Sequence, residues 1–211
     1  MRSEIMKLLL LLVFAATHVS ALTVSQLRCE YLVNLEAVQS RHPRLTWLLE
    51  SNDRGARQTA YRILAASSPE ILARNRGDLW DTGKRVSRET VSVEYQGKSL
   101  GAGRRYWWKV QVWDAAGKVS AWSEPARWAA GLEPGGWTAQ WISFKDRSPL
   151  HRSRSELYLP ASRYYRKTFA ISKPVRRATL YASALGIFDA YLNGQRVSDA
   201  MFSPGWSDYR R

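Results

Sequence analysis

The chain has 211 residues, of which 45% are hydrophobic and 24% charged, and its formal net charge is +14. This composition excludes a disordered tail, a collagen-like rod and a multi-pass membrane protein, and the length allows one or two small domains but no barrel enzyme of about 250 residues. The positive charge makes nucleic acid, acidic polysaccharide and membrane surfaces partners to consider.

The first 21 residues have the pattern of a secretory signal peptide. Arg2 and Lys7 precede an unbroken apolar run over residues 8–16, and small residues follow at Val19 and Ala21. The run is too short to span a bilayer, so we expect cleavage after about Ala21, no remaining membrane span, and a secreted or periplasmic protein. An uncleaved N-terminal anchor is the alternative.

Residues 22–131 alternate short β-prone runs with turn signals. The strongest run, 105–113, meets a turn at 114–117 and is predicted to return as a strand over 122–128. Only residues 69–75 (PEILARN) indicate a short helix. Several short strands within about 100 residues predict a β-sandwich of the fibronectin type III or immunoglobulin kind. The remaining predicted strands are 44–49, 58–65 and 91–95.

Two consecutive tryptophans, Trp107 and Trp108, lie inside the strongest predicted strand. Because successive side chains of a strand point to opposite faces, one should fill the core and the other should face a neighbouring domain or solvent. Trp113 shares the parity of Trp107. The exposed face is therefore a candidate docking surface.

Four phrases in residues 43–114 carry a resemblance to known domains. The stretch YWWKVQVWD at 106–114 resembles the final hairpin of a fibronectin type III-like domain. PRLTW at 43–47, QTAYRI at 58–63 and LWDTGK at 79–84 resemble, in this order, the N-terminal module of bacterial α-L-rhamnosidases. This resemblance implies an all-β fold for residues 22–131.

A linker is predicted at 132–136, and residues 137–211 form a second β-rich segment. Strands are expected at 164–169 and 178–183, and Asn193-Gly194 is a strong hairpin signal. The segment resembles the rhamnosidase domain that precedes the catalytic barrel, which implies a partial jelly-roll-like sandwich. The matching phrases are ALG at 184–186, LNG at 192–194, RV at 196–197 and SPGWSDY at 203–209.

The resemblance also implies that the chain includes only about half of this second sandwich. It implies too that the chain ends before the (α/α) catalytic barrel of the family. An incomplete sheet exposes strand edges and an apolar face. We therefore expect a fragment of a longer protein, from a truncated or split gene. The alternative is a complete short protein with an unusually small sheet.

The family resemblance implies an inverting glycosidase that removes terminal α-L-rhamnose. That reaction uses two carboxyl groups about 6.5–9.5 Å apart, which the family carries on its barrel, so no catalytic residue is assigned here. The acids Asp78 and Asp81, and Glu89 and Glu94, are better explained as solvated or turn-capping groups than as a catalytic pair.

Sugar binding is the activity that the second segment could retain. The resemblance implies that jelly-roll-like domains of this family bind rhamnose beside a calcium ion, through Asp and Asn oxygens. The candidates are Asp189, Asn193, Trp206 and Asp208, with Asp199 as a further oxygen donor. For Asn193 a turn role competes with ligand binding, and for Trp206 packing does.

Transition metals are not expected, because the single cysteine, Cys29, and the scattered histidines form no ligand pattern. Cys29 is expected to be a buried free thiol. Residues 144–177 hold ten basic and two acidic side chains, but no nucleic-acid-binding motif accompanies them, and nucleic acid is not an expected partner.

The sequence thus predicts the non-catalytic N-terminal portion of an exported α-L-rhamnosidase-like glycoside hydrolase. Its expected partners are the catalytic domain of the parent protein and a rhamnose-containing glycan or glycoside. The alternative is a free-standing secreted carbohydrate-binding or adhesion module. Residues 22–131 are expected to fold alone, and residues 132–211 are not.

Overall fold

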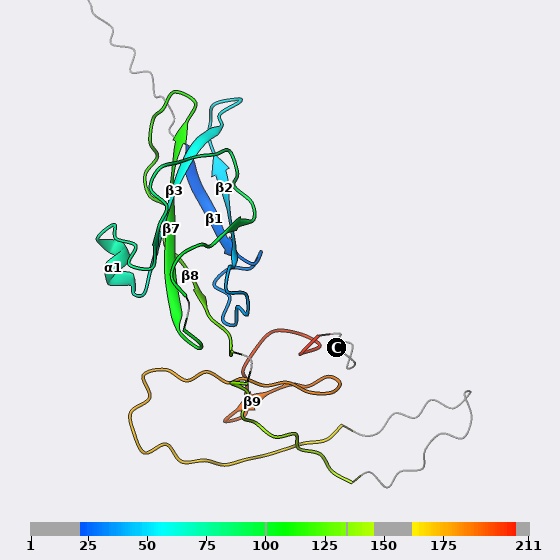
Figure 1. The fold of residues 1–211 in the computed structure, drawn as a ribbon. Coiled ribbons are helices and arrows are strands. Elements are labelled where there is room, and N and C mark those ends of the chain that lie inside the picture. The colour runs from blue at the N-terminus through cyan, green and yellow to red at the C-terminus, as the bar shows by residue number, and fades with distance from the viewer. Residues whose placement is uncertain (1–21, 100, 134, 146–161, 206–211) are drawn as a thin grey trace, which may run out of the picture. The chain divides into compact units, whose positions relative to one another are not determined.

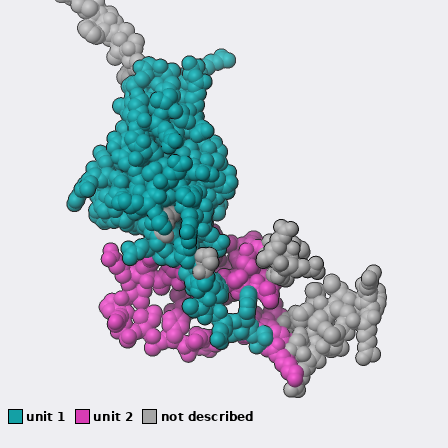
Figure 2. Space-filling view, viewed as in Figure 1, with its two compact units in different colours: residues 1–143 teal, residues 144–211 magenta. Residues whose placement is uncertain are grey.

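The computed structural model describes residues 22–99, 101–133, 135–145 and 162–205. The chain divides into two compact units, residues 1–143 and residues 144–211, which Figure 2 distinguishes by colour. The predicted signal peptide lies outside the described residues. No helix in the described ranges is long and apolar enough to cross a membrane.

Unit 1 is built around two antiparallel sheets that face each other as a sandwich (Figure 1). One sheet has the strand order β1 (Thr23–Cys29), β2 (Arg44–Glu50), β6 (Val93–Glu94). The other has the order β4, β3, β7, β8, and β5 also pairs with β3. These strands are β3 (Gln58–Ala66), β4 (Trp80–Asp81), β5 (Arg85–Val86), β7 (Arg105–Asp114) and β8 (Ala126–Ala129).

A single short helix, α1 (Pro69–Ala73), links β3 to β4 within the described residues. Ser68 caps it, because its hydroxyl accepts a hydrogen bond from the Ile71 N–H at 3.3 Å. Proline occupies the first turn, where its missing N–H costs nothing. The helix predicted at 69–75 is therefore confirmed, although it ends at Ala73.

The core of unit 1 fills the space between the sheets with aromatic rings. Trp47, Trp108 and Trp128 are fully buried, and Trp128 contacts Trp108 and Tyr95 edge-on, with ring centroids 6.5 and 5.7 Å apart. Burying each such side chain contributes about 1.5–3 kcal/mol, and the edge-on contacts add to it. The large rings therefore let two small sheets enclose a sufficient core.

Strand β7 has two apolar faces. Trp108 points into the core, whereas Trp107 packs on the opposite side of the sheet against Leu64, Ala66 and Leu72. The predicted alternation of the two tryptophans is confirmed. The all-β fold with an immunoglobulin-like sandwich is confirmed as well.

The chain returns from β7 in an unusual way. Ser120 and Ser123 each donate a backbone N–H to β7, to the carbonyls of Val112 and Val110, both at 2.8 Å. Their hydroxyls accept the N–H groups of the same two valines, both at 3.0 Å. The predicted strand 122–128 is thus wrong at its start: β8 begins at Ala126, because serine hydroxyls replace the carbonyls of a regular ladder.

Unit 2 contains one hairpin among its described residues, β9 (Tyr191–Leu192) and β10 (Gln195–Arg196). Asn193 (φ 50°) and Gly194 (φ 82°) form its turn, as the sequence predicts. The strands expected at 164–169 and 178–183 are not formed. Their aromatic and β-branched residues suit a strand, but in the described chain they have no neighbouring strand to pair with.

None of the described side chains of residues 144–205 is buried. Figure 2 shows the open packing of this unit in magenta. Large apolar residues are more than half exposed along its length, including Phe169, Ile187 and Phe202 at 66%, 70% and 66%. Unit 2 therefore has no hydrophobic core of its own in the described ranges.

Candidate functional site

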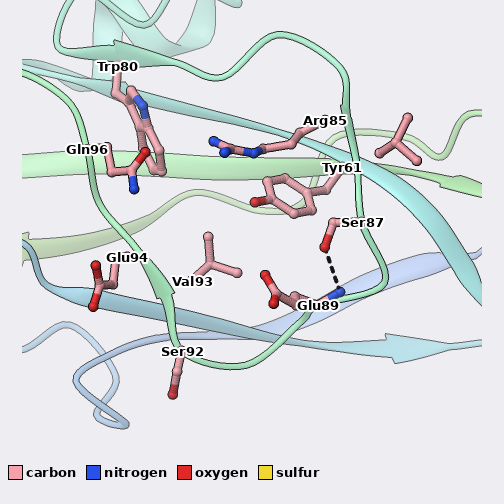
Figure 3. Close-up of a pocket in the computed structure, with 10 residues that line it drawn as sticks. Tyr61, Trp80, Arg85, Ser87, Glu89, Ser92, Val93, Glu94 and Gln96 are labelled. Atoms are coloured by element: carbon pink, nitrogen blue, oxygen red, sulfur yellow. Dashed lines mark hydrogen bonds between the residues drawn. The ribbon is translucent and has the colours of Figure 1, made fainter.

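A cavity of about 440 Å³ lies at one edge of the sandwich, where the chain crosses from β5 to β6 (Figure 3). Its volume falls within the range of small-molecule sites, about 300–1,000 Å³. Polar and aromatic side chains line it. The principal ones are Tyr61, Trp80, Arg85, Glu89, Glu94 and Gln96.

The walls of the cavity belong to both sheets. Strand β5 pairs with β3, which places Arg85 opposite Tyr61. Strand β6 pairs with β2, which places Glu94 opposite Arg44. The crossing segment 87–92 therefore joins one sheet to the other and contributes Ser87, Glu89 and Ser92 to the lining of the cavity.

Buried Gln58 fixes the crossing segment. Its amide nitrogen donates hydrogen bonds to the carbonyls of Ser87 and Glu89, at 3.1 and 2.9 Å. Its amide oxygen accepts the indole N–H of Trp47 at 3.1 Å. A glutamine at the start of β3 thus holds the cavity wall from inside the core.

Tyr61 presents a hydroxyl at the cavity. The residue is only 3% exposed, and the hydroxyl forms no hydrogen bond with the described part of the chain. Burial raises the pKa of Tyr61; Arg85 acts to lower it and Glu89 to raise it. Figure 3 shows the hydroxyl between the guanidinium of Arg85 and the carboxylate of Glu89, which form no ion pair with each other.

The half-buried indole of Trp80 forms an aromatic wall. Its ring meets Tyr95 edge-on, with centroids 5.1 Å apart. Gly97 packs directly over this pair, and a Cβ there would lie 2.6 Å from the Trp80 Cβ and 2.4 Å from the Tyr95 hydroxyl. The absence of a side chain at 97 is what allows Trp80 to sit at the cavity.

The cavity has the chemistry of a binding site. Ser87 is the candidate nucleophile of the lining. Its hydroxyl oxygen accepts a hydrogen bond from the Glu89 N–H at 3.0 Å and contacts no base among the described residues. The lining contains no histidine or cysteine. What remains is a set of hydrogen-bond donors and acceptors beside an aromatic ring.

Two of the four acids considered as catalytic candidates, Asp78 and Asp81, have structural roles. Asp78 accepts the Ser67 N–H and hydroxyl at 2.9 and 2.6 Å. Asp81 binds Arg62 through two hydrogen bonds of 2.9 and 2.7 Å, and these lower the pKa of its carboxyl. Glu89 and Glu94 line the cavity, which sequence reasoning did not anticipate.

The sugar-binding candidates of unit 2 are placed less favourably. The carboxylate of Asp189 is bound by Arg196, whose Nε donates at 3.1 Å. Asn193 occupies the hairpin turn, and Trp206 and Asp208 lie outside the described residues. The described ranges hold no cluster of His, Cys, Asp and Glu side chains that could bind a metal ion, so calcium binding stays a prediction.

A second feature lies on the outer face of the β3–β7 sheet, where Trp107 and Trp113 emerge. Trp122 packs there between two cations, Arg62 and Lys109, at 5.9 and 5.0 Å from its ring centroid. Lys109 is 7% exposed, and its ammonium donates to the Asn75 side-chain oxygen at 2.5 Å. Burial lowers the pKa of Lys109. This outer face combines aromatic area with partly desolvated positive charge.

Comparison with known protein families gives one match in each unit. Residues 24–133 match the family described as Rha78A-like, N-terminal immunoglobulin domain. Residues 173–211 match the family described as α-L-rhamnosidase N-terminal domain.

The related proteins are much longer than this chain. An α-L-rhamnosidase of Formosa agariphila is 36% identical over 172 residues, which cover 80% of this chain and 18% of the relative. One of Alteromonas sp. is 37% identical over 187 residues, covering 86% and 20%. The crystal structure of Streptomyces avermitilis α-L-rhamnosidase complexed with L-rhamnose is 43% identical, with a TM-score of 0.55, covering 58% of this chain and 12% of that one. The chain thus spans about a fifth of its curated relatives.

Proposed function

Because the chain belongs to the Rha78A-like N-terminal immunoglobulin domain family of α-L-rhamnosidases, we propose that it is the non-catalytic N-terminal part of an exported glycoside hydrolase. In this role it docks onto the part of the enzyme that removes terminal α-L-rhamnose. The hydrolysis itself belongs to the remaining four-fifths of the relatives' length, which this chain does not match.

The observation that carries this proposal is the exposed apolar surface of unit 2. Soluble proteins rarely leave a large contiguous apolar area in water, and a lone two-stranded hairpin is at best marginally stable. Ile187, Tyr191 and Phe202 are each at least 60% exposed around that hairpin. Covering them would stabilise unit 2 and the complex together.

The comparison supports one candidate for the segment that covers the exposed apolar surface of unit 2. Residues 173–211 match the α-L-rhamnosidase N-terminal domain, and the whole match to this relative covers only 18% of its length. The rest of that architecture is therefore the natural cover for the exposed side chains. The outer face of unit 1, with Trp107 and Trp113, offers a second contact area for the same neighbour.

The test reconstitutes the enzyme from two pieces. The chain is mixed with a segment of the Streptomyces avermitilis α-L-rhamnosidase that begins where the match ends. We expect a complex on size-exclusion chromatography and hydrolysis of p-nitrophenyl α-L-rhamnoside that exceeds that of either piece. The chain alone should not hydrolyse this substrate.

Matched variants locate the contact. Ile187→Asp and Phe169→Asp place a charge on the exposed apolar surface of unit 2 and should abolish the complex. Val33→Asp changes an apolar side chain of unit 1 that is 61% exposed and should leave the complex intact. Hydrolysis by the chain alone would refute the non-catalytic assignment, and failure of the pieces to associate would refute docking.

A further inference from the structure

We infer that the cavity at the edge of unit 1 binds a neutral sugar, whose hydroxyl groups pair with Tyr61, Arg85 and Glu89 beside the ring of Trp80. This site is distinct from Asp189 and Asn193, the candidates of unit 2. The inference does not depend on the docking function, because all of its residues belong to the sandwich of unit 1.

The Tyr61 hydroxyl is the first reason. The ring of Tyr61 is buried and the residue is only 3% exposed. Its hydroxyl lies at the cavity and is not among the fully buried polar atoms without a partner, which in the described ranges are the indole N–H groups of Trp108 and Trp128. Because the hydroxyl has no protein partner within those ranges, it is available to form a hydrogen bond with a ligand hydroxyl in the cavity.

The complementary charges beside this hydroxyl are the second reason. Arg85 offers several N–H donors in one plane, and the carboxylate of Glu89 accepts but does not donate. Figure 3 shows the Tyr61 hydroxyl between these two groups. Adjacent hydroxyls of a sugar ring are donors and acceptors at once, and they can satisfy an arginine and a glutamate together.

The charges of the lining favour a neutral ligand over an anion. The lining carries one cation, Arg85, and two carboxylates, Glu89 and Glu94. Arg44, opposite Glu94 in the sheet, forms its ion pair with Glu30. The cavity therefore has no excess of positive charge that would attract an anion. Its polar lining also disfavours a lipid or a flat apolar molecule.

The site is preorganised. Gln58 holds the two carbonyls of the crossing segment, and Gly97 leaves room for Trp80 to remain at the wall. The apolar face of an aromatic ring is suited to the C–H face of a sugar, while its surroundings bond the hydroxyls. Fixed walls lower the entropy lost on binding.

Isothermal titration of the chain with L-rhamnose, D-galactose and D-galacturonate tests the inference. We expect saturable binding of at least one neutral sugar with a Kd of about 10 mM or tighter. Tyr61→Phe, which removes only the hydroxyl, should weaken that binding roughly fivefold, the equivalent of one hydrogen bond. Arg85→Gln should weaken it by a similar factor.

Two control variants separate the possible outcomes. Tyr164→Phe changes a tyrosine that is 96% exposed in unit 2 and should leave affinity unchanged. Asp189→Asn tests the hairpin of unit 2, and a loss confined to this variant would move the site there and overturn the inference. Binding of D-galacturonate alone, or no saturable binding of either neutral sugar, would also overturn it.

The variants remain interpretable because Tyr61→Phe keeps the buried ring and loses no hydrogen bond. An unchanged thermal midpoint shows that the sandwich is intact. Wild-type affinity in a folded Tyr61→Phe variant would show that the sugar binds elsewhere. Because the assay needs no catalytic segment, it succeeds or fails separately from reconstitution of the hydrolase.

Discussion

Trp47 on β2 donates its indole N–H to the side-chain oxygen of Gln58 on β3, 3.1 Å away in the interior of the sandwich. The two residues belong to different sheets. Gln58 then donates to the carbonyls of Ser87 and Glu89 on the cavity wall. One buried pair thus ties the sheets together and fixes the candidate site.

Trp47→Phe tests how much the Trp47–Gln58 hydrogen bond contributes to the free energy of unfolding. It leaves the buried oxygen of Gln58 without its donor, which costs about 1–3 kcal/mol in addition to the lost ring volume. Trp108→Phe is the matched control, because the Trp108 indole N–H is buried without a partner among the described residues. In urea unfolding followed by near-ultraviolet circular dichroism, Trp47→Phe should lose more free energy of unfolding. Equal losses would show that the bond contributes nothing.

Ser120→Ala tests the return path from β7. The Val112 N–H would lose its buried acceptor, so we expect a loss of about 1–3 kcal/mol in the free energy of unfolding. Ser51→Ala removes a hydroxyl that accepts the Asp53 N–H in an exposed turn, where water can replace it. The control should therefore lose well under 1 kcal/mol. The account fails if both variants unfold at the same urea concentration.

Glu36→Gln tests an ion-pair cluster that joins a loop to β7 and β8. Burial acts to raise the pKa of Glu36, but hydrogen bonds from Arg127 and Arg105 prevail and lower it from 4.5. Because the folded pKa is below the unfolded one, this carboxylate stabilises the fold fully above pH 4.5. The contribution disappears as the pH falls through the folded pKa.

The thermal midpoint of Glu36→Gln should therefore lie below that of the wild type at about pH 7, and the gap should close at about pH 2. Glu124→Gln serves as the control, since Glu124 forms no ion pair with the described residues. A gap for Glu36→Gln that persists unchanged into acid would contradict the assignment.

The isolated pieces of the chain should differ in folding. Every buried hydrophobic side chain of the described ranges lies between Leu22 and Ala130, and apolar burial is what offsets the loss of backbone entropy. Residues 22–131 alone should give one cooperative thermal transition, and residues 132–211 alone should give none. A cooperative transition from the second piece would show that it folds without a cover.

Local patterns in the sequence predicted the parts of the fold that depend on neighbouring residues. Strand alternation placed Trp107 and Trp108 on opposite faces, and Asn193-Gly194 marked its hairpin. Pairing could not be predicted in the same way. Residues 164–169 are rich in the aromatic and β-branched residues of strands, yet a strand exists only with a partner, and local sequence does not specify one.

The candidate site illustrates the same limit. Tyr61 and Arg85 are far apart in sequence and meet only because β5 pairs with β3. Glu89 joins them through a crossing segment with no periodic pattern. Gln58 was assigned to a strand correctly, but its role in holding the cavity wall depends on a hydrogen bond from the opposite sheet. Long-range pairing of this kind leaves no motif to recognise.

Cys29 ends β1, which lies at the edge of its sheet next to β2 in the described part of the chain. It is the only cysteine of the chain, it is 1% exposed, and burial raises the pKa of its thiol to about 12. An alkylating reagent needs the thiolate in contact with solvent, so it can react only while β1 is detached. The rate of Cys29 alkylation therefore measures how often β1 opens locally in the native protein.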